Sequence, residues 1–257
     1  MHSLGLALCG GGSKGIAHAG ILKFLIEQEL EPQVLSGTSA GAIVACLYAK
    51  GLTPDEIVEF FKSVYFFRWN HFSITKPGGF IQSDVFQKYL DPIFGEQKIK
   101  ELSKEVYITA TNMLTGKLEV FSREVKITDA IIASCAVPMI ATPYKIGEGL
   151  YSDGGILNNF PADVLKYLAR KIIGVYFSPR KVVEPEEIRS IMQVTSRAYD
   201  LMSSQSEISK ASVCDWFINP APLFNYNMFE GKKSRMEEIF KIGYEEAKKR
   251  YDPELFS

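Results

Sequence analysis

The pentapeptide Gly37-Thr38-Ser39-Ala40-Gly41 lies between two apolar runs, at 34–35 before it and 42–49 after it. This pattern is typical of a strand that turns sharply into a helix with a serine at the apex. The two glycines remove the side chains that would clash as the helix folds back on the strand. The turn also lifts the serine hydroxyl over the positive end of the helix. The pattern therefore predicts an α/β fold and makes Ser39 a candidate nucleophile, although such turns also occur for purely structural reasons.

Strand-like and helix-like segments alternate along the chain, which predicts a three-layer α/β/α sandwich with a mainly parallel central sheet. Strands are expected at 4–9, 34–36, 106–111, 118–122, 150–151, 171–176 and 216–219. Helices are expected at 13–29, 40–48, 53–64, 127–134, 186–212 and 232–250. Because the sequence contains no internal repeat, low-complexity tract or evident linker, we expect a single domain over 1–257. The motifs described here lie within about 4–169, and a helical extension follows at about 186–257.

The composition argues against several classes of protein. The formal net charge of -1 offers no basic surface for nucleic acid, and no apolar run approaches the roughly 20 residues needed to span a bilayer. Leu6-Ala7-Leu8-Cys9 resembles a lipoprotein cleavage site only superficially, so we expect a cytoplasmic protein. The four cysteines form no C-x-x-C pair and the three histidines no cluster, so no metal site is expected.

A glycine-rich loop, Gly10-Gly11-Gly12-Ser13-Lys14-Gly15, connects the first expected strand to the first expected helix. It matches the G-x-G-x-x-G pattern of dinucleotide sites, but the acidic residue that such sites need after the next strand is absent, since Glu31 precedes that strand. The loop could instead form an oxyanion hole, because consecutive glycines let several backbone N–H groups converge at a helix start. A turn needed only for tight packing is the third interpretation.

The segment Asp153-Gly154-Gly155 follows the expected strand end at 150–151. An aspartate at the carboxyl edge of a parallel sheet lies where ligands bind in such folds, although Asp-Gly-Gly is also an ordinary turn. The histidines do not fit a Ser-His-Asp triad, because His71 precedes Asp153 in the chain and His18 is placed to pack or support the glycine loop. If Ser39 is a nucleophile, its base is therefore expected to be a carboxylate.

Together the glycine loop, the serine turn and the Asp-Gly-Gly segment resemble the patatin-like phospholipase family. The segment 133–138, Ala-Ser-Cys-Ala-Val-Pro, is similar to a softer A-S-x-[AS]-x-P feature of that family, and Lys14 stands where the family also commonly has arginine. The resemblance covers roughly 4–169 in order and spacing. It implies a Ser–Asp dyad with Ser39 as nucleophile and Asp153 as general base, an oxyanion hole from the 10–15 loop around Gly11 and Gly12, and no metal or organic cofactor.

The implied reaction is lipid acyl hydrolysis of the phospholipase, lysophospholipase or carboxylesterase type, through an acyl-serine intermediate. An aspartate with an ordinary pKa near 4 is a poor base at neutral pH, so we expect desolvation to raise the pKa of Asp153. The expected partners are a lipid or other acyl ester and transiently a membrane or micelle surface, with no nucleic acid. Two alternatives stay open: an acyltransferase using the same dyad, and a nucleotide-binding module using the glycine loop.

Three further segments have softer interpretations. The aromatic-rich segment within 64–81 is a lid, an acyl pocket or plain core. Asn158 and Asn159 are expected to occupy turn positions rather than to hold the neighbouring loop by hydrogen bonds. The charged helix at 232–250 is expected to present a solvated face.

Overall fold

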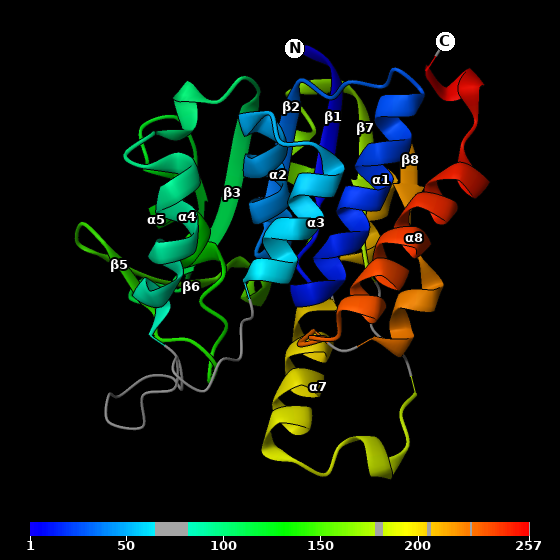
Figure 1. The fold of residues 1–257 in the computed structure, drawn as a ribbon. Helices are drawn as coiled ribbons and strands as arrows, with labels where there is room; N and C mark the ends of the chain where they lie inside the picture. The colour runs from blue at the N-terminus through cyan, green and yellow to red at the C-terminus, as the bar shows by residue number, and fades with distance from the viewer. Residues whose placement is uncertain (65–81, 178–181, 205–206, 227, 257) are drawn as a thin grey trace.

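The computed structural model describes residues 1–64, 82–177, 182–204, 207–226 and 228–256 (Figure 1). Within these residues an eight-stranded mixed sheet has the order β5-β6-β3-β2-β1-β7-β8, and β4 pairs with β3. The pairs β1–β2, β2–β3, β1–β7 and β7–β8 are parallel. The strands are β1 (His2–Leu8), β2 (Val34–Thr38), β3 (Glu105–Asn112), β4 (Lys117–Phe121), β5 (Tyr144–Ile146), β6 (Gly149–Asp153), β7 (Ala169–Val175) and β8 (Trp216–Ile218).

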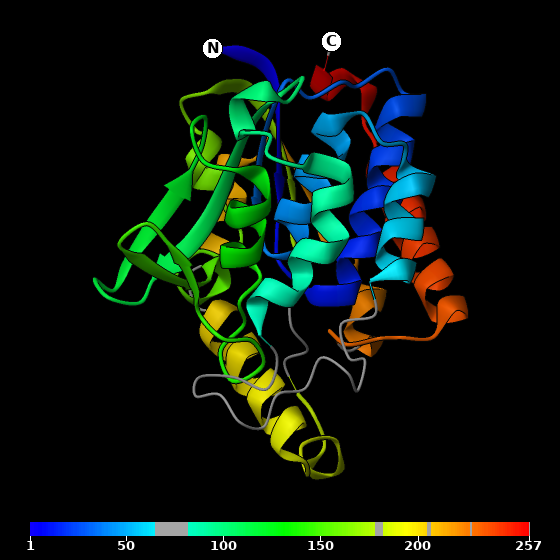
Figure 2. The same cartoon turned by 60° about the vertical axis from the view of Figure 1, so that its left-hand side comes forward.

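Helices cover both faces of the sheet, which confirms the predicted three-layer arrangement. Figure 1 shows α1, α2, α3 and α8 in front of the strands, and Figure 2 shows the short α6 (yellow-green) on the opposite side. The helix expected at 53–64 is present, and Thr53 and Glu56 form a capping box at its start. The helices are α1 (Ile16–Glu27), α2 (Ala40–Lys50), α3 (Pro54–Ser63), α4 (Gln87–Phe94), α5 (Ile127–Ser134), α6 (Ala162–Leu165), α7 (Ile191–Ser204) and α8 (Lys233–Arg250).

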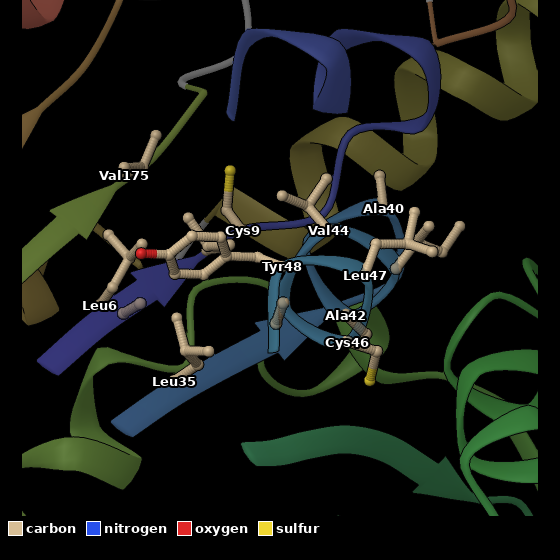
Figure 3. Packing of buried hydrophobic residues seen from close by; sticks show 14 of the residues in the cluster. Leu6, Cys9, Leu35, Ala40, Ala42, Val44, Cys46, Leu47, Tyr48 and Val175 are labelled. Carbon is tan, nitrogen blue, oxygen red and sulfur yellow. The ribbon is translucent and has the colours of Figure 1, made fainter. Parts of the chain in front are cut away.

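The helix α2 packs on β1 and β2 in the core of the protein. Figure 3 shows Val44 and Leu47 of α2 close to the strands that carry Leu6 and Leu35, and all four side chains are fully buried. Burying an aliphatic side chain of this size contributes roughly 1.5–3 kcal/mol. Because α2 is buried all round, the turn at its N-terminus has a fixed position relative to the sheet.

The register of β3 brings the ends of two other strands together. Thr109 of β3 lies opposite Thr38, the last residue of β2, and the next residue, Ala110, lies opposite Asp153, the last residue of β6. Both β3 residues also pair with β4, so β2 and β6 must share the other edge of β3. Because β2 runs parallel to β3 and β6 antiparallel, they point toward each other along that edge. The sheet thus places Asp153 next to the turn that carries Ser39.

The single helix expected at 186–212 is a wrong prediction. The region contains a 3-10 turn at Pro185–Glu187, then α7, then a second 3-10 helix at Ile208–Val213. At the end of α7 the hydroxyls of Ser203 and Ser204 donate to backbone carbonyls three residues back. Serine hydroxyls compete in this way with the helical hydrogen bonds of the backbone, which a reading based on the lack of glycine and proline overlooked.

The charged helix expected at 232–250 forms as α8 with the expected solvated face. Its opposite face is buried, which the sequence did not predict. A Cβ atom on Gly243 would lie 2.1 Å from the carbonyl oxygen of Ala17, and one on Gly20 would lie 2.0 Å from that of Phe240. The backbones of α1 and α8 are therefore in direct contact. The buried residues of α8 recur at helical spacing: Met236, Ile239, Gly243 and Ala247.

Two further expectations concern a membrane-spanning helix and the aromatic-rich segment. No helix in the described ranges is both long and apolar enough to cross a bilayer. The aromatic-rich segment at 64–81 lies, apart from its first residue, outside the described residues.

Candidate active site

Ser39 stands at the apex of the turn between β2 and α2. Its φ of 53° and ψ of -120° lie outside the common regions for residues other than glycine, which costs on the order of 1–3 kcal/mol. Close backbone contacts hold this conformation, because a Cβ on Gly41 would lie 2.2 Å from the carbonyl oxygen of Leu8 and one on Gly37 would lie 2.6 Å from the nitrogen of Ala42. The strand–turn–helix geometry expected from the pentapeptide is therefore present.

The end of α5 and the residues directly after it bind the backbones of both Ser39 and Asp153. The backbone N–H of Ser39 donates to Oγ of Ser134 at 2.8 Å, and Ser134 is fully buried. Two residues further along the chain, the carbonyl oxygen of Ala136 accepts a hydrogen bond from the N–H of Asp153 at 2.9 Å. The segment 133–138 was matched to the family in sequence but had no role assigned to it. Its role in the structure is to hold both ends of the site.

Asp153 is fully buried at the end of β6. Its Oδ1 accepts hydrogen bonds from the N–H of Gly155 at 2.7 Å and from the hydroxyl of Tyr199 at 2.8 Å. Its Oδ2 makes no hydrogen bond to any residue that the structure describes. Burial raises the pKa of Asp153 to about 6, although the donors from Gly155 and Tyr199 and the neighbouring Ser39 hydroxyl favour the charged form. A buried carboxylate with a raised pKa is what the sequence led us to expect.

The glycine loop crosses directly over the turn. A Cβ on Gly10 would lie 3.2 Å from Cβ of Ser39 and 2.4 Å from Oδ1 of Asn159. The N–H of Gly10 is occupied by the carbonyl oxygen of Asn159 at 3.1 Å. In contrast, the N–H groups of Gly11 and Gly12 make no hydrogen bond within the described part of the chain. Both residues line the cavity that contains Ser39, so the loop brings two backbone donors to the wall of this cavity.

The second half of the loop is not brought into that cavity. Oγ of Ser13 accepts a hydrogen bond from the N–H of Glu230 at 2.7 Å. Lys14, nearly buried, lines a separate small cavity together with Asp200. A Cβ on Gly15 would lie 2.6 Å from Cβ of Ala40, so this glycine lets the loop pack against the start of α2. These three residues support the loop rather than line the cavity.

The cavity that contains Ser39 and Asp153 has mostly apolar walls. Side chains from α2, from the segment before α4 and from the segment after α5 contribute to them. Apolar walls with few convergent polar groups are typical of sites for hydrophobic ligands. The apolar lining residues include Ile43, Phe86, Val137, Ile140, Ala141 and Phe229.

Comparison with known proteins agrees with this geometry. A family model described as patatin-like phospholipase matches residues 6–166, a span that contains the glycine loop, Ser39 and Asp153. The chain belongs to the patatin-like phospholipase family. An uncharacterised NTE family protein of Mycobacterium tuberculosis is 29% identical over 164 residues, which cover 63% of this chain and 28% of that protein. The uncharacterised protein YqhO of Bacillus subtilis is 28% identical over 228 residues, which cover 75% of this chain and 78% of that protein.

The patatin-like fold is also similar to a solved structure, VipD from Legionella pneumophila. The two superimpose with a TM-score of 0.66 at 16% sequence identity, over 96% of this chain and 66% of VipD. At this level of identity the likeness concerns the fold alone. The chain spans little more than a quarter of the length of the mycobacterial relative, at 28%.

Two residues of this patatin-like site were missed in the sequence. Tyr199 of α7 donates to Asp153, and no sequence signal marks a lone tyrosine in an amphipathic helix. Cys135 lies in the cavity wall, and burial, followed by the nearby charge of Asp153, raises the pKa of its thiol well above the usual value. The only sequence signal for Cys135 is its position inside the 133–138 segment, and that segment does not indicate which of its residues line a cavity.

The expectation for Asn158 is wrong. Its Nδ2 donates to Oδ1 of Asp163 at 3.0 Å, and its Oδ1 accepts from Nζ of Lys210 at 2.7 Å. Its carbonyl oxygen also accepts from the hydroxyl of Thr38 at 2.9 Å. Asn158 therefore holds the loop after Asp153 instead of simply occupying a turn position. Its partners are two charged side chains: Asp163, which is close in sequence, and Lys210, which is distant in sequence.

The buried carboxylate of Glu207 holds the same loop from the far side. It accepts hydrogen bonds from the N–H groups of Asn159 at 3.3 Å and Phe160 at 2.9 Å. The ammonium group of Lys210 lies 3.1 Å from it. The chain after α7 thus positions the Asp153 loop, although it lies outside the residues that the family model matches.

His18 supports the glycine loop, as expected. Its Nε2 lies 2.9 Å from the carbonyl oxygen of Cys9, and its ring stacks on Phe177 with 4.4 Å between centroids. Burial lowers the pKa of His18 to about 4. His71 lies outside the described residues. Within the described ranges, no group of three or more His, Cys, Asp or Glu side chains could hold a metal ion.

Proposed function

We propose that this patatin-like protein hydrolyses carboxylic ester bonds of lipids through an acyl-serine intermediate. The observation that carries the proposal is the placement of a strained Ser39 beside a fully buried Asp153 whose Oδ2 has no described hydrogen-bond partner. Membership of the patatin-like phospholipase family supports the same class of reaction. Acyl transfer and nucleotide binding are the two alternative functions, and each predicts a different result in the experiment below.

The proposed reaction has two halves. Oγ of Ser39 attacks the ester carbonyl carbon while Oδ2 of Asp153 takes its proton, and the electron pair of the carbonyl bond moves to the oxygen. The N–H groups of Gly11 and Gly12 stabilise this oxyanion. When the intermediate collapses, the ester C–O bond breaks and the leaving alkoxide takes the proton from Asp153. Water then attacks the acyl-serine with Asp153 again as base, which releases the fatty acid and restores Ser39.

The raised pKa explains how an aspartate serves as the base. A general base works best when its pKa lies near the working pH, and the pKa of Asp153, at about 6, is closer to neutrality than the usual value of 3.8. Above pH 6 most of the carboxylate is still ionised and available. The strain at Ser39 supports the same step, since the hydroxyl is held in position before the substrate arrives.

The walls of the cavity support a lipid as the acyl donor. The residues that surround Ser39 on the α2 and α5 sides are Ile43, Val137 and Ile140. Such walls gain contacts with each methylene of an acyl chain, at about 0.8 kcal/mol per buried CH₂. We therefore propose a long acyl chain rather than a charged or sugar-like acyl group, with transient contact between the protein and a membrane or micelle surface.

The test compares the intact protein with Ser39→Ala on phosphatidylcholine micelles and on a short-chain p-nitrophenyl ester. Removing a serine nucleophile typically lowers kcat by about 10³-fold or more, and the matched control Ser234→Ala, at an exposed position of α8, should keep full activity. Free fatty acid and lysolipid should appear in equal amounts.

Three results would contradict the proposal. Transfer of the acyl group to an added alcohol without free fatty acid would indicate an acyltransferase. A nucleotide that stays bound during purification, with no ester cleavage, would indicate the nucleotide-binding alternative. Full activity in Ser39→Ala would exclude Ser39 as the nucleophile.

A further inference from the structure

The geometry points to a third functional side chain: we propose that Tyr199 is a positioning residue that fixes the orientation of the Asp153 carboxylate and sets the pH range in which it acts as a base. The inference rests on the proposed function of Ser39 and Asp153. Tyr199 lies on α7, beyond the residues that the family model matches.

The two oxygens of Asp153 differ in their hydrogen bonds. Oδ1 accepts from Tyr199 at 2.8 Å and from the N–H of Gly155 at 2.7 Å, while Oδ2 accepts from no described residue. Two donors on one oxygen hold the carboxylate in one orientation and leave the lone pairs of the other oxygen for an incoming proton. Oδ2 is therefore the basic oxygen, and Tyr199 is one of the two groups that make it so.

The backbone next to Asp153 leaves room for this contact. A Cβ on Gly155 would lie 2.1 Å from the hydroxyl oxygen of Tyr199, closer than any real contact. The second glycine of the Asp-Gly-Gly segment thus allows the tyrosine to reach Oδ1. Tyr199 also lines the cavity that contains Ser39 and Asp153, so its ring excludes water from the carboxylate as well.

Tyr199 acts as a neutral donor. Burial and the nearby charge of Asp153 raise the pKa of Tyr199 well above the usual value, so its hydroxyl keeps its proton while Asp153 titrates. A donor to the charged form lowers the pKa of a carboxyl group. Tyr199 therefore opposes the effect of burial on Asp153 and extends its ionised range toward lower pH.

The other titratable groups around Asp153 come from three neighbouring elements. Cys135 follows α5, and the raised pKa of its thiol keeps it protonated. Asp200 adjoins Tyr199 on α7, where burial raises its pKa, and Lys14 of the glycine loop partly offsets that effect. Replacement of Tyr199 by phenylalanine leaves all three in place and changes no charge.

The first experiment compares Tyr199→Phe with Tyr167→Phe, a control at a tyrosine that is 77% exposed. The pH dependence of kcat/KM should keep its shape in Tyr199→Phe, but its acidic limb should move up by about one pH unit, since hydrogen bonds to charged groups are among the stronger ones. We expect kcat at neutral pH to fall about 10-fold with little change in KM, because the hydroxyl acts on the base rather than on the substrate. An unchanged acidic limb would overturn the proposal, even if activity or thermal stability fell.

A second measurement does not depend on activity. In protein labelled with ¹³C at aspartate carboxyl carbons, the signal absent from Asp153→Asn identifies Asp153. Its titration midpoint should lie higher in Tyr199→Phe than in the unsubstituted protein and stay unchanged in Tyr167→Phe. A shifted midpoint in a protein without esterase activity would contradict the proposed function but support the contact. An unshifted midpoint in an active enzyme would overturn the role of Tyr199 alone.

Gly155→Ala gives an independent check on the same contact. The added methyl group would displace the tyrosine hydroxyl first and would also crowd Oδ1 of Asp153, which lies 3.0 Å from its position. If Tyr199 acts as proposed, Gly155→Ala should lower kcat/KM by a smaller factor in the Tyr199→Phe background than alone, since interacting residues are not additive. Equal factors in both backgrounds would overturn the link between Gly155 and Tyr199.

Discussion

Two helices flank Ser39 and Asp153, and they are built in different ways. Every residue of α2 from Ala40 to Ala49 is buried, and the helix begins directly after Ser39. In α7, Ser203 is the single buried residue among the side chains that the structure describes, and the helix reaches the site through the hydroxyl of Tyr199. Figure 1 shows α2 against the sheet and α7 below its edge. The helix α2 is part of the core, whereas α7 packs on the outside of the core and leaves most of its side chains at least partly exposed.

The two helices hold the site by different kinds of contact: packed backbone atoms at α2 and one hydrogen bond at α7. The conformation of Ser39 is held by backbone atoms that approach backbone atoms, as at Gly41 and Leu8, and such contacts have no freedom to relax. The contact from α7 is a single hydrogen bond, which a substitution removes without disturbing the core. We therefore expect changes near α2 to unfold the protein and changes on α7 to tune its chemistry.

The largest expected effect is that of Gly41→Ala. The new Cβ would lie 2.2 Å and 2.6 Å from the carbonyl oxygens of Leu8 and Cys9, so the end of β1 and the start of α2 must separate. We expect a loss of unfolding free energy above about 3 kcal/mol, as for severe overpacking of a core. Urea denaturation followed by circular dichroism measures it.

The matched change on α7 is Ala198→Gly, at an exposed position. It should cost only the difference in helix propensity, about 1 kcal/mol. If Gly41→Ala were no more destabilising than Ala198→Gly, the contrast between the two helices would be wrong.

The next largest effect is that of the Asp153 carboxylate, which lies between α2 and α7, on the free energy of unfolding. The pKa of Asp153 in the folded protein, at about 6, is higher than the ordinary 3.8, so the folded state binds more protons than the unfolded state between these values. This carboxyl group therefore lowers stability progressively as pH rises from 4 to 6. Asp153→Asn should raise the free energy of unfolding by up to about 3 kcal/mol at about pH 8 and leave it unchanged at about pH 4.

Denaturation by urea at the two pH values tests this sign. Asp215→Asn, at a partly exposed aspartate that accepts from the N–H of Ile172, is the control and should not stabilise the protein at either pH. A destabilised Asp153→Asn at about pH 8 would contradict the claim that burial of the charge opposes folding.

The smallest expected difference is in local opening of the two helices. Since α7 buries few of its side chains, its backbone amides should exchange with solvent at least about 100-fold faster than those of α2. Hydrogen–deuterium exchange with mass spectrometry resolves the two segments. Equal protection would indicate that α7 is as firmly held as the core.

Sequence reasoning predicted the α2 side of the site well. The Gly37 to Gly41 turn, the glycine loop and Asp153 each have a local signature, because small residues are required wherever backbones approach closely. The sheet layers followed from the alternation of strand and helix patterns. What no pattern showed was the register of β3, which brings the ends of β2 and β6 together. That pairing depends on contacts between strands distant in sequence.

The α7 side could not be predicted for the same reason. The hydrogen bonds from Tyr199 to Asp153 and from Asn159 to Glu207 join residues about 50 positions apart, and neither residue type is unusual in its segment. The buried contact of α8 with α1 did have a weak signal, since Gly20 and Gly243 are small residues within helices. The high Lys and Glu content of α8 masked this signal, because the overall composition does not show that the charged residues gather on one face of the helix.

The rate at which a fluorophosphonate labels Ser39 shows whether Asp153 activates this serine. Across the pH range the rate should rise with a midpoint near 6, the pKa of Asp153, and mass spectrometry should place the adduct on Ser39. In Asp153→Asn we expect labelling to be slower by about 10³-fold or more, with no inflection near that pH. If Asp153→Asn is labelled at the rate of the unsubstituted protein, or if the adduct lies on another residue, Asp153 does not activate Ser39.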